Sequence, residues 1–443
     1  MKLESKNRFE IGSMENLLPM EIIFDIFSRL PFELVFECRR VCKTWRNIIY
    51  NPSFAHFYLQ TGRQLPQFDD YDHNFNNKCN SIFNADSDEV GLGLLFLIRF
   101  SDKDKGNVGL YFGEYDENQI GKYSYEKLTK INHPPINKPN EFAMVGSCNG
   151  LICFSVPQYP IYDPVYIFNP ITREYINLPR FNIKKRTDYW TGHMVCGFGY
   201  HPTTNYEYKV VRIYYCGKRP IGEVQVYTLG DGRGWRKKGK IPWSLSTMIH
   251  TKTYPPPSPG ILANGALYWM NKEQKIVAFD LADEEFRVVS PPPCFLPTGY
   301  NEYKHCFQLR ELGRCLCVVH QVRGECVEIW SFKKTKNGTS YKMKEEEYLS
   351  WTWSREFRIR WEGQHKNEYE PFALTKSGEV LLLYNHKILF RYDPKTATLK
   401  KLVVDDGTGL KYFQGVPHMN SFVSLKALGE RCKTRRRYMC KDK

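Results

Sequence analysis

The feature that most constrains the fold of this sequence is a group of short alternating strands that recurs about every fifty residues. One group runs Ala266–Met270, Lys275–Leu281 and Phe286–Ser290, after the hairpin-forming dipeptide Asn264-Gly265. The same plan recurs over 151–178 and 380–403. The middle strands carry aromatic residues at equivalent positions, namely Phe168, Tyr227, Phe279, Trp330 and Tyr392. The intervals between them are 59, 52, 51 and 62 residues.

A unit of three or four strands leaves one apolar face uncovered, and stacking such units in a ring covers all of these faces. We therefore predict a β-propeller of kelch-like spacing with about six blades, counting the strand-rich segment 92–128 as one of them. The aromatic share of 15% suits such a β-rich body. Ser421–Leu425 is predicted to pair with the first blade and close the ring. A β-sandwich with long meanders is the competing architecture.

Residues 14–60 have a helical pattern instead. Pro19 stands at a first-turn position, and an apolar stripe follows with helical spacing, formed by Ile22, Ile23, Ile26, Phe27 and Leu30. In the next segment we expect an inward set, formed by Leu34, Val35, Cys38, Val41, Cys42 and Trp45. About 45 residues bury too little surface to be stable alone, so a partner should cover one face. The alternative is a small helical cap that packs on the rest of the chain.

Four sub-motifs in this segment resemble a plant F-box in order and spacing. They are Leu18-Pro19-Met20-Glu21-Ile22, Arg29-Leu30-Pro31, Arg40-Val41-Cys42-Lys43-Thr44-Trp45-Arg46 and Asn51-Pro52-Ser53-Phe54. The resemblance implies that the module binds a Skp-type adaptor, which bridges to cullin and RING subunits. It makes eight residues either adaptor-binding or part of the module core: Leu18, Pro19, Ile22, Leu30, Pro31, Leu34, Val41 and Trp45.

The β-rich part resembles the F-box-associated domain of plants. The motifs that carry the resemblance are Val145–Cys153 (VGSCNGLIC), Phe168–Glu174 (FNPITRE) and Gly197–Pro202 leading into Tyr208–Ile213. His201 replaces the usual Asp, and Asn205-Tyr206-Glu207 holds one extra residue, which affects the shape of a loop. The implied fold class is a small all-α F-box module followed by an all-β domain, a kelch-like β-propeller.

We divide the chain into a disordered N-terminus (1–13), the F-box module (14–60), a linker (61–89), the propeller domain (90–425) and a basic disordered tail (426–443). The tail carries 8 Lys/Arg against 2 Asp/Glu, and either serves as a nuclear address or stays solvated. No secretory signal opens the chain, and Val90–Ile98 is too short to span a bilayer. We expect a cytoplasmic or nuclear protein, away from membranes, with its 14 cysteines as thiols.

No grouping of residues predicts catalysis, a metal site or a cofactor, so we expect a protein that is not an enzyme. Cys315 and Cys317 should face one side of a buried strand, and Cys38 and Cys42 should fill the module core. Gly230–Gly234 looks superficially like a phosphate-binding loop, but no helix follows it, so we predict a hairpin loop.

The mixture of basic and aromatic residues at Trp351–Trp361 suits nucleic acid, a strand face, or an acidic or phosphorylated protein segment. In the strand-face alternative, Trp351, Trp353, Phe357, Ile359 and Trp361 turn inward. We do not expect nucleic acid as a partner. Target-reading loops are expected at 182–194, 251–260, 292–304 and 363–370. The individual target-binding candidates are Tyr254, Arg358, Arg360 and Trp361.

These features predict the substrate-recognition subunit of an SCF-type (Skp-cullin-F-box) ubiquitin ligase. The module would dock on the Skp-type adaptor, and the propeller would bind a target protein for ubiquitination. The alternative is a β-propeller ligand-binding protein or enzyme whose helical N-terminus is structural. A third possibility is an adaptor-bound protein that acts outside degradation.

Overall fold

The computed structural model describes residues 19–61 except 31, and most of 92–434. Within 92–434 the longer gaps are 101–107, 117–127, 133–142, 159–160, 183–191, 246–258, 296–300, 335–350 and 404–409, and shorter ones lie in loops. The predicted N-terminal segment 1–13 and residues 62–89 of the predicted linker lie outside the described residues. No helix in the described ranges is long and apolar enough to cross a membrane.

Four short helices form the N-terminal module: α1 (Met20–Ser28), α2 (Phe32–Cys38), α3 (Lys43–Ile49) and α4 (Pro52–Thr61). Proline begins α4 at a position where the missing N–H costs no hydrogen bond. The ring of Phe27 packs edge-on against Trp45 at 5.1 Å and against Phe54 at 6.0 Å. These contacts hold α1, α3 and α4 together around a small aromatic core.

The rest of the described chain forms six antiparallel sheets. The first contains β24 (Leu410–Pro417), β1 (Leu92–Phe100), β2 (Val108–Tyr115) and β3 (Thr129–Ile131). The second contains β4 (Ala143–Cys148), β5 (Leu151–Gln158), β6 (Ile161–Phe168), β7 (Glu174–Asn177) and β25 (Lys433–Thr434). The third contains β8 (His193–Tyr200), β9 (Tyr208–Tyr215), β10 (Gly222–Thr228) and β11 (Arg236–Ile241).

The last three sheets follow the same meander. The fourth contains β12 (Ile261–Ala263), β13 (Ala266–Met270), β14 (Ile276–Asp280) and β15 (Phe286–Val289). The fifth contains β16 (His305–Leu312), β17 (Cys315–Val322), β18 (Cys326–Lys334) and β19 (Trp351–Arg360). The sixth contains β20 (Tyr369–Leu374), β21 (Val380–Tyr384), β22 (Ile388–Asp393) and β23 (Thr398–Val403).

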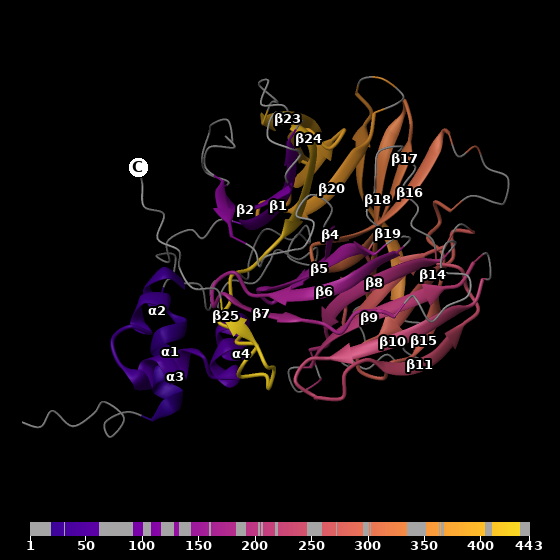
Figure 1. Cartoon of the computed structure of the whole chain (residues 1–443). Coiled ribbons are helices and arrows are strands. Elements are labelled where there is room, and N and C mark those ends of the chain that lie inside the picture. Colours follow the sequence, from indigo (N-terminus) through magenta and orange to yellow (C-terminus); the bar gives the residue numbers. More distant parts are fainter. Residues whose placement is uncertain are drawn as a thin grey trace, which may run out of the picture.

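The sheets are the blades of a propeller, because the first strands of successive sheets contact one another from β4 through β8, β12, β16 and β20 to β24 (Figure 1). Separate apolar layers fill the spaces between neighbouring blades. The repeating aromatics lie in β6, β10, β14, β18 and β22, the third strand of each of five blades. The six-bladed propeller predicted from this repeat is therefore confirmed, and the sandwich alternative is wrong.

The ring closes differently from the prediction. β24 pairs antiparallel with β1, from Leu94 opposite Pro417 to Arg99 opposite Tyr412, so one blade combines the first and last long strands. Ser421–Leu425, which we predicted as the closing strand, forms no strand. Its residues are buried for another reason, because the segment lies between propeller and module and Phe422 packs against the helices.

Candidate functional site

The helical module exposes five large apolar side chains, which together we call the apolar face. Met20, Ile22 and Ile26 on α1 are 50%, 45% and 42% exposed, and Leu34 on α2 and Val41 after it are 53% and 66% exposed. Only three other large hydrophobic residues of the described chain are exposed, all in the propeller: Ile221, Val288 and Tyr303. A concentration of apolar surface on so small a unit is typical of a protein-binding site.

The structure separates the predicted adaptor-binding residues into two groups. Ile22, Leu34 and Val41 lie at the surface, whereas Leu30 and Trp45 are partly buried against the core. Pro19 is exposed, and Leu18 and Pro31 lie outside the described residues. The sequence analysis missed Met20 and Ile26 as surface residues. The four-residue spacing of Ile26 from Ile22 was the signal that could have found it.

Three residues that we predicted to face inward are exposed: Leu34, Val41 and Cys42. For Val41 and Cys42 the cause is that α2 ends at Cys38, so the helical period does not continue through the turn that follows. Leu34 lies within α2, whose buried side carries Phe32 and Val35 instead. Cys42 does not fill the core either. Its Sγ accepts a hydrogen bond of 3.3 Å from the backbone N–H of Trp45 and so caps α3.

Charged side chains lie among these apolar residues along the chain. Arg29 pairs with Asp25 at 2.8 Å, and Arg40 pairs with Glu37 at 2.7 Å, with all four side chains about half exposed or more. Such pairs add little stability. They do place polar groups beside the apolar face, as in the rim of an interface.

The module contacts the propeller through residues 418–432, which we call the strap (Figure 1). Phe422 of the strap is 1% exposed and stacks on Phe32 of α2, with 4.4 Å between ring centroids. It also meets Tyr58 of α4 edge-on at 5.3 Å and lies 6.2 Å from Phe54. A residue more than 350 positions away in sequence therefore completes the aromatic core of the module.

The other side of the strap is held by blade 2. Asn169 Nδ2 donates hydrogen bonds to the carbonyl oxygens of Ser421 at 3.2 Å and Val423 at 2.7 Å. Its Oδ1 accepts from the backbone N–H groups of Ile171 and Thr172, which fixes the turn after β6. Asn169 is completely buried, so all of these bonds are shielded from water.

Two further contacts hold the strap closely against the propeller. Ser421 Oγ donates to the carbonyl of Asn149 at 2.6 Å. At the neighbouring Gly150, where φ is +80°, a Cβ atom would lie only 2.1 Å from Ser421 Oγ. The turn between β4 and β5 therefore needs glycine both for its backbone conformation and for the approach of the strap.

Carboxylates fix the second half of the strap. Glu174 of β7 accepts from Ser424 Oγ at 3.1 Å and from the Lys426 N–H at 3.4 Å. Glu430 accepts from the Gly230 N–H at 2.8 Å and lies 3.2 Å from the hydroxyl of Tyr227. Burial and this carboxylate raise the pKa of Tyr227, so the phenol stays a hydrogen-bond donor. We predicted the tail to be disordered from residue 426, but residues 426–434 are ordered against the propeller.

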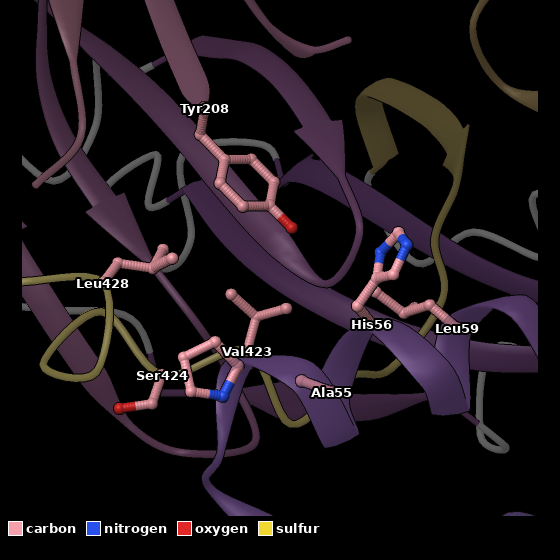
Figure 2. Close-up of a pocket in the computed structure, with 8 residues that line it drawn as sticks. Ala55, His56, Leu59, Tyr208, Val423, Ser424 and Leu428 are labelled. Atoms are coloured by element: carbon pink, nitrogen blue, oxygen red, sulfur yellow. The ribbon is translucent and has the colours of Figure 1, made fainter. Parts of the chain in front are cut away.

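A small cavity lies where α4, β9 and the strap meet (Figure 2). Its volume is about 10 Å³, which is room for about one water molecule. The lining residues come from all three elements: Pro52, Ala55, His56, Leu59, Tyr208, Val423, Ser424 and Leu428. Burial lowers the pKa of His56 and raises that of Tyr208, so both are neutral. This cavity between α4, β9 and the strap is too small to hold a small-molecule ligand.

The target-binding candidates are not brought together. Arg358 and Arg360 are exposed on β19, and the Nε atom of Arg358 lies 3.8 Å from Glu328. Trp361 is 7% exposed and packs edge-on against Tyr369 of blade 6, so it belongs to the core. Tyr254 and most of the four predicted target-reading loops lie outside the described residues.

The apolar residues of 351–361 turn inward, which agrees with the strand-face alternative, but they face two different blades. Trp351 and Trp353 pack in the layer between blades 4 and 5, whereas Ile359 and Trp361 pack between blades 5 and 6. The change of face follows from a bulge, because Ile329 pairs with Phe357 and the next residue, Trp330, pairs with Arg355. Glu356 is the extra residue, and one extra residue exchanges the two faces of a strand.

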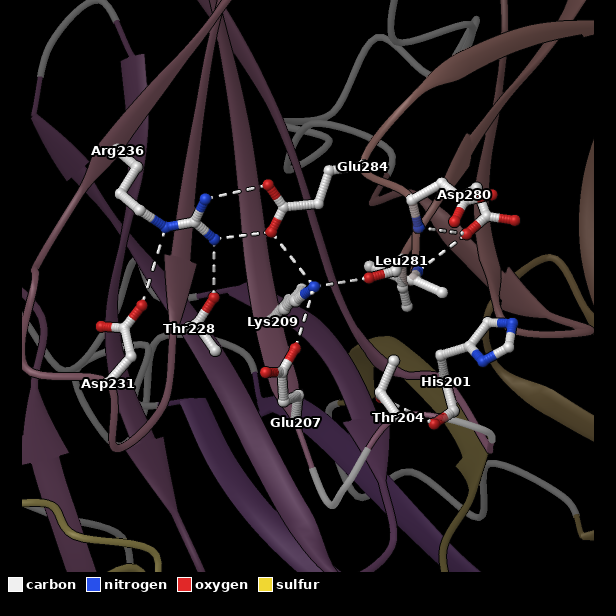
Figure 3. Close-up of polar contacts among 12 residues, drawn as sticks. His201, Thr204, Glu207, Lys209, Thr228, Asp231, Arg236, Asp280, Leu281 and Glu284 are labelled. Carbon is white, nitrogen blue, oxygen red and sulfur yellow. Dashed lines mark hydrogen bonds and ion pairs between the residues drawn. The ribbon is translucent and has the colours of Figure 1, made fainter.

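A network of ion pairs joins blades 3 and 4 (Figure 3). Glu284 pairs with Arg236 at 2.6 Å, Lys238 at 2.8 Å and Lys209 at 3.1 Å. Burial raises the pKa of Glu284, but the hydrogen bonds from these three cations outweigh it and bring the pKa well below its usual range. Glu284 is therefore always ionised near neutral pH, and the network is suited to joining blades rather than to proton transfer.

The described residues contain no cluster of three or more side chains that could hold a metal ion. Cys315 and Cys317 lie on one side of β17 in the layer between blades 5 and 6, as predicted. Gly230–Gly234 connects β10 to β11, so it is the predicted hairpin loop.

Two family models match the chain. The model described as "F-box associated beta propeller domain" matches residues 96–425, and the one described as "F-box-like" matches residues 16–60. Several proteins of Arabidopsis thaliana are similar over most of their length. F-box protein At3g07870 is 29% identical over 92% of this chain and 90% of its own. F-box protein CPR1 is 25% identical, covering 88% and 85%, and F-box/kelch-repeat protein At3g23880 is 23% identical, covering 73% and 78%.

Proposed function

Because this chain belongs to the plant F-box proteins with an F-box associated β-propeller domain, we propose that it is the substrate-recognition subunit of an SCF-type ubiquitin ligase. The F-box module docks on a Skp-type adaptor, and through it on the cullin and RING subunits. The propeller binds the target protein. The receptor itself is not catalytic, since it acts by raising the effective concentration of target lysines near the activated ubiquitin.

The observation that carries the proposal is the apolar face on α1 and α2. Met20, Ile22, Ile26, Leu34 and Val41 are all more than 40% exposed, although the helices bury other apolar residues in a core that Phe422 of the strap completes. Covering a large aliphatic side chain that is half exposed contributes about 1 kcal/mol. Five such residues together contribute about 5 kcal/mol of apolar contact to a docking surface.

The target surface is proposed on the propeller. Arg358 and Arg360 stand on the outer strand of blade 5, and two exposed guanidinium groups suit an acidic or phosphorylated segment of the target. Trp361 is omitted from this surface because it is buried.

The adaptor-binding half is tested with the purified full-length protein and a purified Skp-type adaptor in isothermal titration calorimetry. We expect the double variant Ile22→Ala/Leu34→Ala to weaken binding about 10- to 30-fold, because it removes most of two exposed apolar contacts. Circular dichroism should show an unchanged fold, since neither side chain is part of the module core.

A matched control is available on the propeller. Ile221 and Val288 are 48% and 47% exposed, close to the values for the residues changed in the module. Ile221→Ala/Val288→Ala should leave the adaptor affinity unchanged. No binding by the folded wild-type protein would overturn the proposal. The propeller would then need screening as a ligand-binding module or enzyme with a structural helical N-terminus.

A further inference from the structure

Phe422 belongs to the hydrophobic core of the F-box module although it lies in the C-terminal strap. It contacts aromatic rings of two helices, Phe32 on α2 and Tyr58 on α4, and is almost completely buried there. The strap next to it is fixed to the propeller by hydrogen bonds from Asn169 and to Glu174. The same short segment is therefore hydrogen-bonded to the propeller on one side and packed against the module on the other.

The strap is anchored on the propeller side by the motifs that carry the resemblance to the F-box-associated domain. Asn149 and Gly150 lie in the first of these motifs, and Asn169 and Glu174 lie in the second. Each of these residues touches the strap or leaves the space that it needs. These two motifs thus have a structural task in common, which is to seat the first half of the strap.

We propose that the strap is the joint that sets the orientation of the F-box module on the propeller, with Phe422 as the positioning residue. The inference deepens the proposed function. Its consequence for ubiquitin transfer rests on the protein being the substrate receptor proposed above. A receptor raises the rate of transfer only if it holds the target within reach of the activated ubiquitin, and that distance depends on the angle between module and propeller. The joint determines that angle without contacting adaptor or target.

The sharpest test is Asn169→Asp, which changes the strap seat and leaves the module untouched. Aspartate keeps the Oδ1 atom that accepts from Ile171 and Thr172, so the turn after β6 is retained. Its second oxygen replaces the NH₂ group and faces the carbonyl oxygens of Ser421 and Val423, which the ionised carboxylate repels.

Asn271→Asp is the matched control. Asn271 is also buried, and its Oδ1 accepts from the backbone N–H groups of Glu273 and Lys275 in the turn after β13. It lies in blade 4, away from the strap. The same chemical change is therefore made in a similar turn without disturbing the joint.

Two measurements on the full-length protein without adaptor report on the joint. Hydrogen–deuterium exchange should become at least tenfold faster in the strap and α4 of Asn169→Asp, and small-angle X-ray scattering should show a larger maximum dimension. Asn271→Asp should match the wild-type protein in both. Adaptor affinity of Asn169→Asp should stay within threefold, because the apolar face is unchanged.

Substitutions of Phe422 give an independent test from the other side of the joint. Phe422→Ala should increase the maximum dimension in the same way, and Phe422→Leu should restore it because an apolar contact with Phe32 returns. The inference is overturned if Asn169→Asp frees the strap in the exchange experiment while the scattering curve stays that of the wild-type protein. It is equally overturned if Asn169→Asp changes neither measurement. Neither result depends on the adaptor, so failure of the joint and failure of the proposed function are distinguishable.

Discussion

His418 is a completely buried histidine beside the strand that closes the ring. Its Nδ1 atom lies 2.8 Å from Ser147 Oγ, and its Nε2 atom has no hydrogen-bond partner among the described residues. Burial lowers its pKa to about 3. The unfolded chain has a histidine pKa of about 6.5, so the unfolded state takes up a proton first as the pH falls. The stability that neutral His418 contributes is present above pH 6.5 and is lost as the pH falls from there toward 3.

We therefore expect acid to destabilise the wild-type protein more than His418→Gln, by about 2 kcal/mol at pH 5. Urea unfolding of both proteins at pH 5, 6.5 and 8 measures the difference, and parallel pH dependences would contradict the prediction. His386→Gln is a control of opposite sign. Burial would lower the pKa of His386, but Glu368 and Glu370 raise it to about 9, so its contribution is complete below pH 6.5 and is lost as the pH rises through 9.

At the scale of residues, the sequence identified which side chains are apolar but not which are covered. Leu34 and Val35 are neighbours of the same chemical type, yet one is 53% exposed and the other is completely buried. The difference arises from where α2 ends and how it packs on α3, which no local pattern specifies. Phe422 could not be assigned to the module from sequence, because its partners in α2 and α4 lie at the other end of the chain.

Among the elements, β19 depends most on a single residue. The extra residue Glu356 lets Trp353 pack on Phe332 toward blade 4, while Ile359 packs toward blade 6. Deletion of Glu356 should force one half of the strand onto the wrong face and lower the free energy of unfolding by more than about 3 kcal/mol. Chemical denaturation followed by tryptophan fluorescence measures this loss.

Glu356→Ala distinguishes the effect of the extra residue in β19 from the effect of the Glu356 side chain. It removes the hydrogen bonds from Ser331 and Ser354 and the ion pair with Lys333 at 3.1 Å, but it keeps the bulge. Its cost should be about 1 kcal/mol. If deletion costs no more than this substitution, the bulge does not determine the faces of β19.

Strands were predictable where both hairpin turns and alternation are clear. β13 and β21 have the predicted bounds, Ala266–Met270 and Val380–Tyr384. β24 was missed because Gly415 and Pro417 weaken its pattern, while Ser421–Leu425 nearby is a short run rich in apolar residues, as in a buried strand. Ser421–Leu425 is buried because it lies between module and propeller, and a short buried run is not specific to sheets.

For the whole molecule, the number and order of blades followed from the repeat, since each blade can only cover its faces with its neighbours. The position of the module did not follow. No repeat or motif indicates that the layer between blades 2 and 3 continues into the helices, but the buried residues there form one cluster with those of the module. The contact was visible only once Phe422 and the strap were placed in three dimensions.

Two C-terminal truncations separate the closure of the ring from the joint. Removal of 419–443 keeps β24, so the propeller should still unfold in one cooperative transition, while the module loses Phe422 and becomes protease-sensitive. Removal of 410–443 also takes β24 from β1 and exposes the unpaired edge of a strand whose residues fill the layer between blades 6 and 1.

The longer truncation should therefore aggregate, or should lower the thermal midpoint by more than about 10 °C relative to the shorter one. Size-exclusion chromatography and thermal unfolding of the two truncated proteins side by side make the comparison. Equal midpoints would mean that pairing of β24 with β1 does not hold the ring together. Blade 1 would then have to be stable with its first three strands alone, which is not expected for a strand as apolar as Leu92–Phe100 with one open edge.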